Sequence, residues 1–209
     1  MQDVIIVGAG GQGLIVADIL LKSSGARPVG FVSDDAATRP RAILGIPVIG
    51  TPDLLARTAH DAIIVAIGDN RTRRVVTERL VASGERVITV RHLFTNIAAD
   101  VTIGEGSMIS AGVVITPGAT IGRGVLLNTS CSVDHQSTIG DFAHISFQAG
   151  IGANCAIGEE SMIGGGATVV SGRRVGARTV IGAGAVVLHD IGDGLVAYGV
   201  PAKIVRDTR

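Results

Sequence analysis

Aliphatic residues recur at every sixth position through the second half of the chain. From Ile97 to Val187, all sixteen positions of this series are Ile, Leu or Val. A helix with 3.6 residues per turn cannot keep such a series on one face, and an isolated strand alternates with a period of two. The pattern therefore predicts a coil with flat sides, in which three six-residue units (hexads) make one turn and each aliphatic residue points inward. Sixteen hexads correspond to about five turns.

Two other positions of the hexad also follow a rule. The position four residues after each aliphatic residue is mostly small or β-branched, as at Ser107, Ala119 and Cys131. Glycine fills many of the second and fourth positions, as at Gly104 and Gly106. We expect the small residue to fit near a corner of the coil and glycine to support the tight bend there.

The first ninety residues alternate short apolar runs with helical patterns. Val4–Val7 is followed by a glycine turn over residues 8–13 with the spacing G-x-G-x-x-G, and then by a helical stripe over residues 14–20. Further apolar runs cover residues 29–32, 63–67 and 87–90. The alternation predicts a small parallel α/β unit over residues 1–92, a boundary near residues 92–96, and the coil over residues 96–205.

The glycine turn and the next apolar run suggest a nucleotide site. The glycine spacing lets backbone N–H groups and a helix N-terminus approach a phosphate. Asp34 and Asp35 lie about 20 residues further on, where an acidic side chain can accept from a ribose or a base. Only half of a dinucleotide fold is present, so the mononucleotide end of a larger molecule fits better than a nicotinamide cofactor. The alternative is that these glycines only form a tight turn.

Composition excludes several classes of partner. Eighteen basic residues balance eighteen acidic ones among 209, so no cationic surface is expected for nucleic acid or an anionic membrane. Hydrophobic residues make up 46% of the chain, but no apolar run approaches the roughly 20 residues that span a bilayer. The chain begins without a basic segment ahead of Val4–Val7. We therefore expect a soluble, cytoplasmic protein.

The hexad region resembles the hexapeptide-repeat acyltransferases. Its segment Tyr198–Lys203, with the sequence YGVPAK, is also similar to the segment that closes the coil in that family. The resemblance implies a left-handed parallel β-helix and acetyl-CoA as the acetyl donor. A purely structural solenoid is the alternative reading of the same repeat.

A Rossmann-like half-domain joined to such a coil resembles the family of sialic acid O-acetyltransferases and nucleotide-amino-sugar N-acetyltransferases. In that family the N-terminal unit holds the nucleotide diphosphate of the sugar. The resemblance implies these substrate contacts: Gly11, Gln12, Gly13, Asp34, Asp35 and Asn70. Gln12 stands where many relatives carry His.

The hexads between Leu127 and Ile151 depart from the glycine-rich pattern and concentrate polar side chains. His135 holds the third position of its hexad, outside the inward series, so it should project from the coil. An imidazole can take up a proton near neutral pH, as a general base must. The resemblance implies that His135 is the catalytic base and that an acidic neighbour orients it. Asp134 and Gln136 flank it, and Asp134 is favoured because an ionised partner also raises basicity.

The same resemblance implies contacts to acetyl-CoA and an oligomer. His144 matches a second family histidine near the thioester, and its alternative reading is a polar residue at a corner. Backbone groups along the coil and a lysine at its end are the other candidates: Gly152, Ala153, Gly165 and Lys203. A backbone N–H in this part of the coil, such as that of Ala153, would stabilise the oxyanion that forms on the thioester carbonyl. A homotrimer is implied, with active sites at subunit interfaces.

Other functions were weighed against this one. Cys131 and Cys155 occupy the small inward position, which argues against a covalent acyl-enzyme and against a disulfide. The closely spaced His pair of zinc-binding coils is missing, so no metal is expected. We therefore predict direct acetyl transfer to the amino group of a nucleotide-linked amino-deoxysugar. The alternatives are O-acetylation of a sugar hydroxyl, such as that of sialic acid, and a non-catalytic nucleotide-sugar-binding protein.

Overall fold

The computed structural model describes residues 1–35 and 40–208 of the chain. These residues form two compact units, Met1–Leu93 and a second unit from Phe94 onward. Each unit has its own hydrophobic core.

The N-terminal unit is a five-stranded sheet with helices on both faces. Its strand order is β3-β4-β2-β1-β5, in which β3 runs antiparallel to β4 and the other neighbours are parallel. Its elements in chain order are β1 (Gln2–Val7), α1 (Gly11–Leu21), β2 (Ala26–Val32), β3 (Ala42–Ile43), β4 (Ile46–Gly50), the 3-10 helix η2 (Pro52–Arg57), β5 (Ala62–Val65), α2 (Asn70–Ala82) and β6 (Val90–Arg91).

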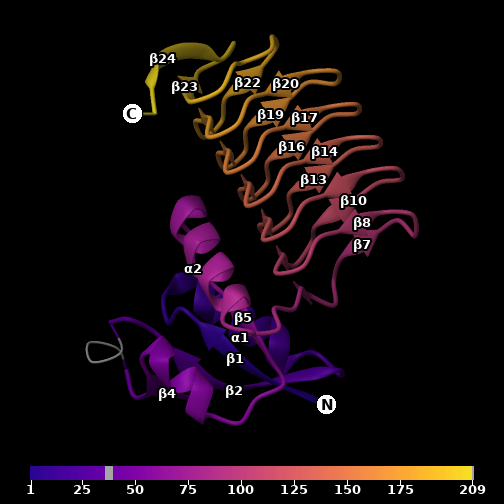
Figure 1. Ribbon diagram of the computed structural model, residues 1–209. Helices are drawn as coiled ribbons and strands as arrows, with labels where there is room; N and C mark the ends of the chain where they lie inside the picture. The colour runs from indigo at the N-terminus through magenta and orange to yellow at the C-terminus, as the bar shows by residue number, and fades with distance from the viewer. Residues whose placement is uncertain (36–39, 209) are drawn as a thin grey trace. The chain divides into compact units, whose positions relative to one another are not determined.

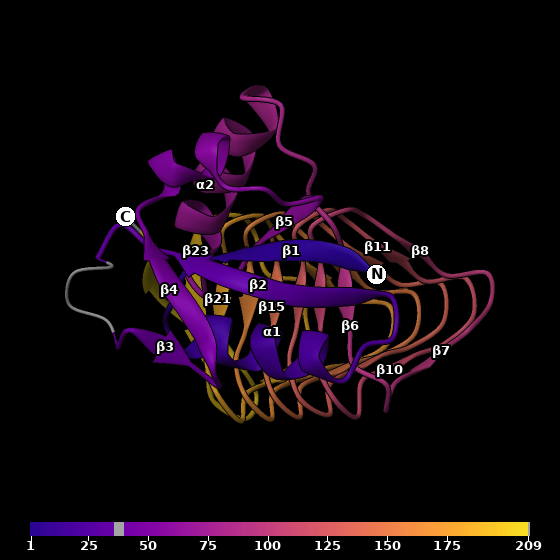
Figure 2. The ribbon, with the colours of Figure 1, turned by 90° about the horizontal axis from the view of Figure 1, so that it is seen from below.

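The two helices cover opposite faces of this sheet, on either side of β1 and β2 (Figure 2). Ile5 and Val7 of β1 pack in one cluster with Val76 and Leu80 of α2. Alternate strand residues point to the other face, where Phe31 of β2 lies against α1. The parallel α/β arrangement predicted from the apolar runs is confirmed for β1, β2 and β5.

Two features of this unit differ from the sequence prediction. The hairpin of β3 and β4 was not anticipated; Leu44 and Gly45 at its turn both adopt positive φ, of 50° and 78°. The apolar run over residues 87–90 is not one continuous strand, because Val87 makes a single parallel bridge to Ile63 and Val90 belongs to the separate strand β6. A run of apolar residues reports burial, and burial does not require a continuous strand ladder.

The second unit is a coil of two-residue strands that stack in parallel (Figure 1). Three faces alternate along the chain. The first face carries β7 (Asn96–Ile97), β10 (Val114–Ile115), β13 (Ser132–Val133), β16 (Gly150–Ile151), β19 (Thr168–Val169) and β22 (Val186–Val187). The second carries β8 (Thr102–Ile103), β11 (Thr120–Ile121), β14 (Thr138–Ile139), β17 (Ala156–Ile157) and β20 (Arg174–Val175).

The third face carries β9 (Met108–Ile109), β12 (Leu126–Leu127), β15 (His144–Ile145), β18 (Met162–Ile163) and β21 (Val180–Ile181). It ends with two longer strands, β23 (Leu195–Tyr198) and β24 (Lys203–Asp207), of which β24 runs antiparallel to β23. Each two-residue strand up to β22 pairs with the strand 18 residues away, as Ile115 pairs with Val133. The aliphatic series is buried from Ile109 to Val187 and forms the core, so the predicted inward stripe is confirmed.

The small fifth position of the hexad is buried at the corners, and its hydroxyl groups connect successive turns. Ser137 Oγ donates to the carbonyl of Gly152 at 2.8 Å and accepts from the N–H of Cys155 at 3.0 Å. Ser161 and Thr179 make the equivalent contacts further along. These hydroxyls satisfy backbone groups that a corner would otherwise leave buried and unpaired.

The fourth position of the hexad takes a left-handed conformation, which explains why glycine is frequent there. Gly106 has φ of 73° and Gly118 has φ of 75°. Between Ser130 and Glu160 the same position is occupied by residues other than glycine and still has positive φ. The polar segment predicted to hold the site therefore lies where the coil accepts the most backbone strain.

Arg173 occupies a hexad position that is small elsewhere. Its side chain is partly exposed, and Nη1 lies 4.0 Å from a carboxylate oxygen of Asp190. The long side chain therefore turns outward at its corner.

Candidate active site

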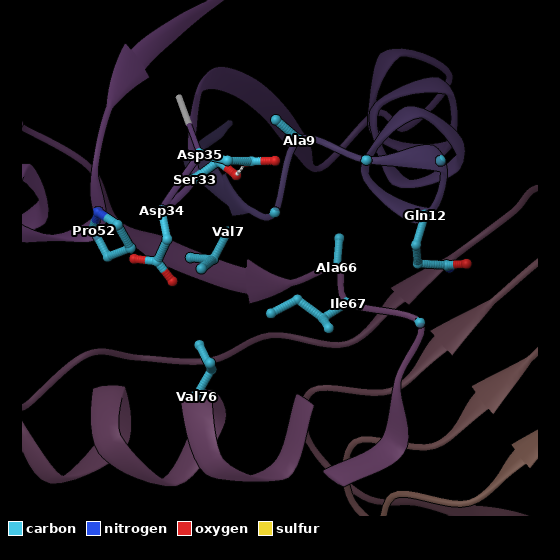
Figure 3. A pocket seen from close by; sticks show the side chains of 14 residues that line it. Val7, Ala9, Gln12, Ser33, Asp34, Asp35, Pro52, Ala66, Ile67 and Val76 are labelled. Atoms are coloured by element: carbon cyan, nitrogen blue, oxygen red, sulfur yellow. Dashed lines mark hydrogen bonds between the residues drawn. The ribbon is translucent and has the colours of Figure 1, made fainter. Parts of the chain in front are cut away.

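A cavity of about 460 Å³ lies in the N-terminal unit at the carboxyl ends of β1, β2 and β5. Parallel α/β folds bind ligands at this edge of the sheet. The cavity is lined by the turn from Val7 to Gln12, by Ser33, Asp34 and Asp35, by Pro52, by Ala66, Ile67 and Gly68, and by Val76. In Figure 3, Gln12 and Asp34 lie at opposite ends of the cavity, with Ala66 and Ile67 between them.

The glycines of the turn have two different roles. A Cβ on Gly8 would lie 2.7 Å from the carbonyl oxygen of Ala66, and Gly8 has φ of 111°. A Cβ on Gly13 would lie 2.1 Å from the carbonyl oxygen of Gly8. Cβ atoms on Gly10 and Gly11 would meet nothing within 4 Å. Gly8 and Gly13 therefore allow the helix to approach the sheet, whereas Gly10 and Gly11 leave open space at the start of α1.

The open end of α1 is suited to an anion. The first N–H groups of a helix lack intrahelical acceptors and carry the positive end of the helix dipole. Gly10 provides no side-chain cap, and the first turn contains no acidic residue. Gly11 and Gln12 line the cavity at this point, while Gly13 is buried behind them.

The two acidic residues after β2 differ in their contacts. The hydroxyl of Ser33 donates to a carboxylate oxygen of Asp35. The Asp34 side chain lies beside Pro52 and points into the cavity (Figure 3). Asn70 begins α2 outside the cavity lining, and its Oδ1 accepts from Arg73 Nη2 at 2.9 Å. The side-chain oxygen of Asn70 is therefore committed to a buried cation.

In the coil, His135 is exposed at the corner between β13 and β14. Asp134 Oδ1 accepts from the backbone N–H of His135 at 2.7 Å and from the hydroxyl of Thr116 at 2.9 Å. The hydrogen bond from the His135 N–H lowers the pKa of the Asp134 carboxyl, and the bond from Thr116 adds to this. Asp134 therefore stays ionised at neutral pH and fixes the backbone that carries His135.

Gln136 follows His135 in the left-handed conformation, with φ of 58°. Its N–H donates to the carbonyl of Pro117 at 3.1 Å, which joins this corner to the previous turn. Asp134 and Gln136 thus both hold the turn through backbone groups.

We predict that Asp134→Ala lowers kcat about 10-fold, because it removes the acceptor that holds the His135 N–H. Asp134→Asn should retain most activity near neutral pH, since an amide oxygen can accept the same two bonds. Steady-state kinetics of both variants at neutral pH provide the test; equal losses would mean that the charge matters more than the hydrogen bonds.

The pKa of the Asp134 carboxyl is lowered in the folded state. The carboxylate therefore stabilises the fold at pH values above the ordinary carboxyl pKa, and this contribution is lost as the pH falls through the pKa of the folded state.

His144 lies on the third face of the coil, half-buried between Leu126 and Met162 of the neighbouring strands. His135 lies at the corner between the first and second faces. In a three-sided coil that corner is opposite the third face. The two histidines of one chain are therefore not brought together.

A groove of about 570 Å³ runs along the first face beside Asp134. It is lined by hydroxyl side chains and glycine backbone: Thr116, Ser132, Gly150, Gly152, Thr168 and Ser171, together with Asp134 and the neighbouring valines and isoleucine. The N–H of Gly152 donates to the carbonyl of Val169 at 2.9 Å. Gly152 thus borders the groove without a free N–H group.

The expectation that Ala153 offers an N–H to an oxyanion is wrong. That N–H donates to Ser171 Oγ at 3.1 Å. Ser171 stands 18 residues after Ala153, one turn along the coil, and Thr116 stands 18 residues before Asp134. The period of the coil, applied to polar residues, identifies both partners from the sequence.

Gly165 keeps its N–H available at a different corner. Among the residues that the structure describes, this N–H makes no hydrogen bond within the protein. The ring of Phe147, which is 53% exposed, covers Gly165, because a Cβ there would lie 2.4 Å from a ring carbon. Phe147 was not anticipated as a site residue. Lys203 is exposed at the start of β24, opposite Tyr198.

The two cysteines and His60 are buried or held by hydrogen bonds. Cys131 and Cys155 are buried and unbridged, and burial raises the pKa of Cys131 to about 12. Both ring nitrogens of His60 are engaged, at 2.7 Å each, with the carbonyl of Thr58 and the carboxylate of Glu85. Across residues 1–35 and 40–208, no group of three or more His, Cys, Asp or Glu side chains is placed to hold a metal ion. No helix within those residues is long and apolar enough to cross a membrane.

Comparisons with known proteins cover both units. The model of the PglD N-terminal domain matches residues 3–80. The acetyltransferase domain of PglB from Neisseria gonorrhoeae is 37% identical, with a TM-score of 0.91, and the match covers 98% of this chain and 100% of that one. PerB from Caulobacter crescentus, solved in complex with CoA and GDP-perosamine, is 33% identical with a TM-score of 0.92, and the match covers 98% of both chains.

Among curated proteins, the UDP-N-acetylbacillosamine N-acetyltransferase of Bacillus subtilis is 30% identical over 121 residues. This match covers 53% of the chain and spans about half (52%) of the length of that relative. The two structural matches extend over nearly the whole chain. By this similarity, the coil is a left-handed parallel β-helix. The chain therefore belongs to the NeuD/PglD-like family of hexapeptide-repeat acyltransferases.

Proposed function

We propose that this protein transfers an acetyl group from acetyl-CoA to the amino group of a nucleotide-linked amino-deoxysugar, a precursor of a surface polysaccharide or glycan. The observation that carries the proposal is the match over nearly the full chain to PerB, which was solved with CoA and GDP-perosamine. The cavity at the start of α1 would bind the nucleotide of the sugar, and the exposed His135 of the coil would accept the proton of the amine.

The reaction is a direct displacement. The sugar amine attacks the thioester carbonyl of acetyl-CoA, and His135 takes the proton that the nitrogen loses as the C–N bond forms. The tetrahedral intermediate then expels the CoA thiolate, and the protonated His135 side chain returns the proton to give the free thiol. Inert, buried cysteines fit a route without an acyl-enzyme. Among the coil N–H groups considered above, that of Gly165 is available to an acetyl-CoA oxygen.

The nucleotide part of the sugar is assigned to the N-terminal cavity. Its diphosphate meets the start of α1 at Gly11 and Gln12, and Asp34 accepts from the ribose or the base at the other end. We place the reaction in the cytoplasm, where acetyl-CoA and nucleotide sugars are available.

A thiol-release assay tests the proposal directly. Acetyl-CoA is supplied with a panel of UDP-, dTDP- and GDP-linked amino sugars and with hydroxy sugars that include sialic acid. Release of CoA with amino sugars only supports the proposal. Release with sialic acid supports O-acetylation instead, and no release with any acceptor supports a binding protein.

Replacing Asp34 and Asp35 with Ala should raise KM for the nucleotide sugar about 10-fold and leave KM for acetyl-CoA unchanged, because only the sugar nucleotide reaches these carboxylates. The matched control is Asp53→Ala, which removes an exposed carboxylate of the same unit outside the cavity lining. An unchanged KM for the sugar in the double variant would separate this cavity from nucleotide recognition.

We further propose that the enzyme is a homotrimer with its active sites at subunit interfaces. His135 and His144 lie on opposite sides of one coil, so they can serve the same thioester only if they come from two chains. Mixing inactive His135→Ala and His144→Ala proteins under subunit exchange should restore part of the activity. A mixture that exchanges subunits and stays inactive would show that the two side chains do not share a site.

A further inference from the structure

Arg73 is completely buried in the N-terminal unit, which is unusual for an arginine side chain. It lies on the buried stripe of α2 with Val76, Thr77 and Leu80. An arginine cannot lose its proton in a protein, so the charge is retained on burial and must be compensated by hydrogen bonds. The position of those hydrogen bonds indicates what the side chain does.

Three acceptors of the Arg73 guanidinium lie in the loop between β5 and α2 and at the first residue of α2. Nη1 donates to the carbonyl of Ile67 at 2.9 Å and to that of Gly68 at 3.1 Å. Nη2 donates to Asn70 Oδ1 at 2.9 Å. Ile67 and Gly68 line the cavity, so the guanidinium lies directly behind one wall of the proposed nucleotide site.

These contacts determine where the loop N–H groups point. In a trans peptide, an N–H points away from the carbonyl of the preceding residue. Because Arg73 holds the carbonyls of Ile67 and Gly68, the N–H groups of Gly68 and Asp69 are directed away from the guanidinium. Gly68 and Asp69 are exposed, and within the described part of the chain neither N–H donates to another protein group.

The other side of the loop is fixed by Asp69. Its Oδ1 accepts from the N–H and the hydroxyl of Thr72, at 2.8 and 2.6 Å, and so caps α2. The hydroxyl of Thr72 lowers the pKa of Asp69, followed by the backbone hydrogen bond from Thr72, and the charges of Arg73 and Arg71 act in the same direction. The Asp69 side chain is thus committed to the helix, and its backbone N–H stays free.

We propose that Arg73 is a positioning residue for the nucleotide diphosphate: it turns the N–H groups of Gly68 and Asp69 toward the cavity, where they supplement the start of α1. This inference rests on the proposed function of the cavity. The fork of the guanidinium reaches three acceptors at once, which a lysine ammonium on a single stem cannot reproduce with the same geometry.

The test measures binding of UDP, dTDP and GDP to the full-length protein by calorimetry. Arg73→Met should weaken the diphosphate that binds best about 10-fold or more, and Arg73→Lys should weaken it several-fold although the charge is kept. Arg71→Met is the matched control, because it removes an exposed charge from the same turn of α2; its affinity should stay close to that of the wild type. Acetyl-CoA binding should be equal in all four proteins.

A second measurement separates positioning from a purely structural role. Amide NMR signals of Gly68 and Asp69 in the wild type should shift on titration with the diphosphate, whether or not Arg73→Met folds well. Loss of folded protein would lower the number of binding sites in calorimetry without changing Kd. Failure of the wild type to bind any of the three diphosphates would overturn the proposed function itself. Wild-type binding with unshifted Gly68 and Asp69 signals and an unchanged Kd in the Arg73 variants would overturn this inference alone.

Discussion

Replacing His135 with Ala is expected to lower kcat by roughly 10²–10⁴, the range that general-base catalysis contributes. The reason is that the amine must lose a proton as it attacks the thioester, and the exposed imidazole is the group assigned to take it. Acetyl-CoA binding should remain nearly intact, since the donor is held by other parts of the coil. Steady-state measurement of thiol release gives kcat, and calorimetry gives the affinity for CoA.

The coil provides a matched control for this variant. His189 is also exposed and also holds the third position of a hexad, the one that begins at Val187. It has no place in the proposed site, so His189→Ala should keep wild-type kcat. If His135→Ala retained most of its activity, His135 would have to be removed from its role as base.

The sequence was sufficient to predict the coil because the period leaves little freedom. A six-residue series of Ile, Leu and Val is buried on one side only if three hexads close a turn, and the observed register of 18 residues follows. Positive φ at the fourth position explains the glycines there, for example Gly118. The period also placed His135 outside the core, where the structure has it.

The contacts around the site were harder to predict from the sequence, because they join residues that are distant along the chain. Asp134 was expected to orient the His135 ring, but its carboxylate holds the backbone N–H with help from Thr116, one turn earlier. Ala153 was expected to have a free N–H, but Ser171 accepts from it, one turn later. Side-chain identity at one position does not reveal such pairs unless the 18-residue period is also applied to polar residues.

In the N-terminal unit, the glycine spacing predicted the turn, but it did not predict which glycines are needed for packing and which line the cavity. Gly11 and Gly13 were both expected to contact substrate, yet only Gly11 lines the cavity. The burial of Arg73 could not be inferred either, because the acceptors at Ile67, Gly68 and Asn70 are backbone and amide oxygens, which no spacing of charged residues indicates.

Gly13→Ala is expected to destabilise the N-terminal unit by about 3 kcal/mol or more, in the range of severe packing defects. The added methyl would lie 2.1 Å from the carbonyl oxygen of Gly8, and a backbone oxygen cannot move aside without displacing the turn. Hydrogen exchange should show lost protection in β1 and α1. Nucleoside diphosphate binding should be lost with it, because the turn from Gly8 to Gln12 lines the cavity.

Gly11→Ala tests the other half of this division. A Cβ on Gly11 meets nothing within 4 Å, and alanine is a better helix former than glycine by about 1 kcal/mol, so the stability of the unit should stay equal or rise slightly. The space that the methyl enters is the space assigned to the diphosphate, so affinity for the nucleoside diphosphate should fall. Thermal denaturation and calorimetry on the two variants therefore separate a glycine required for packing from one required for the ligand. Equal affinity in Gly11→Ala and the wild type would place the diphosphate elsewhere in the cavity.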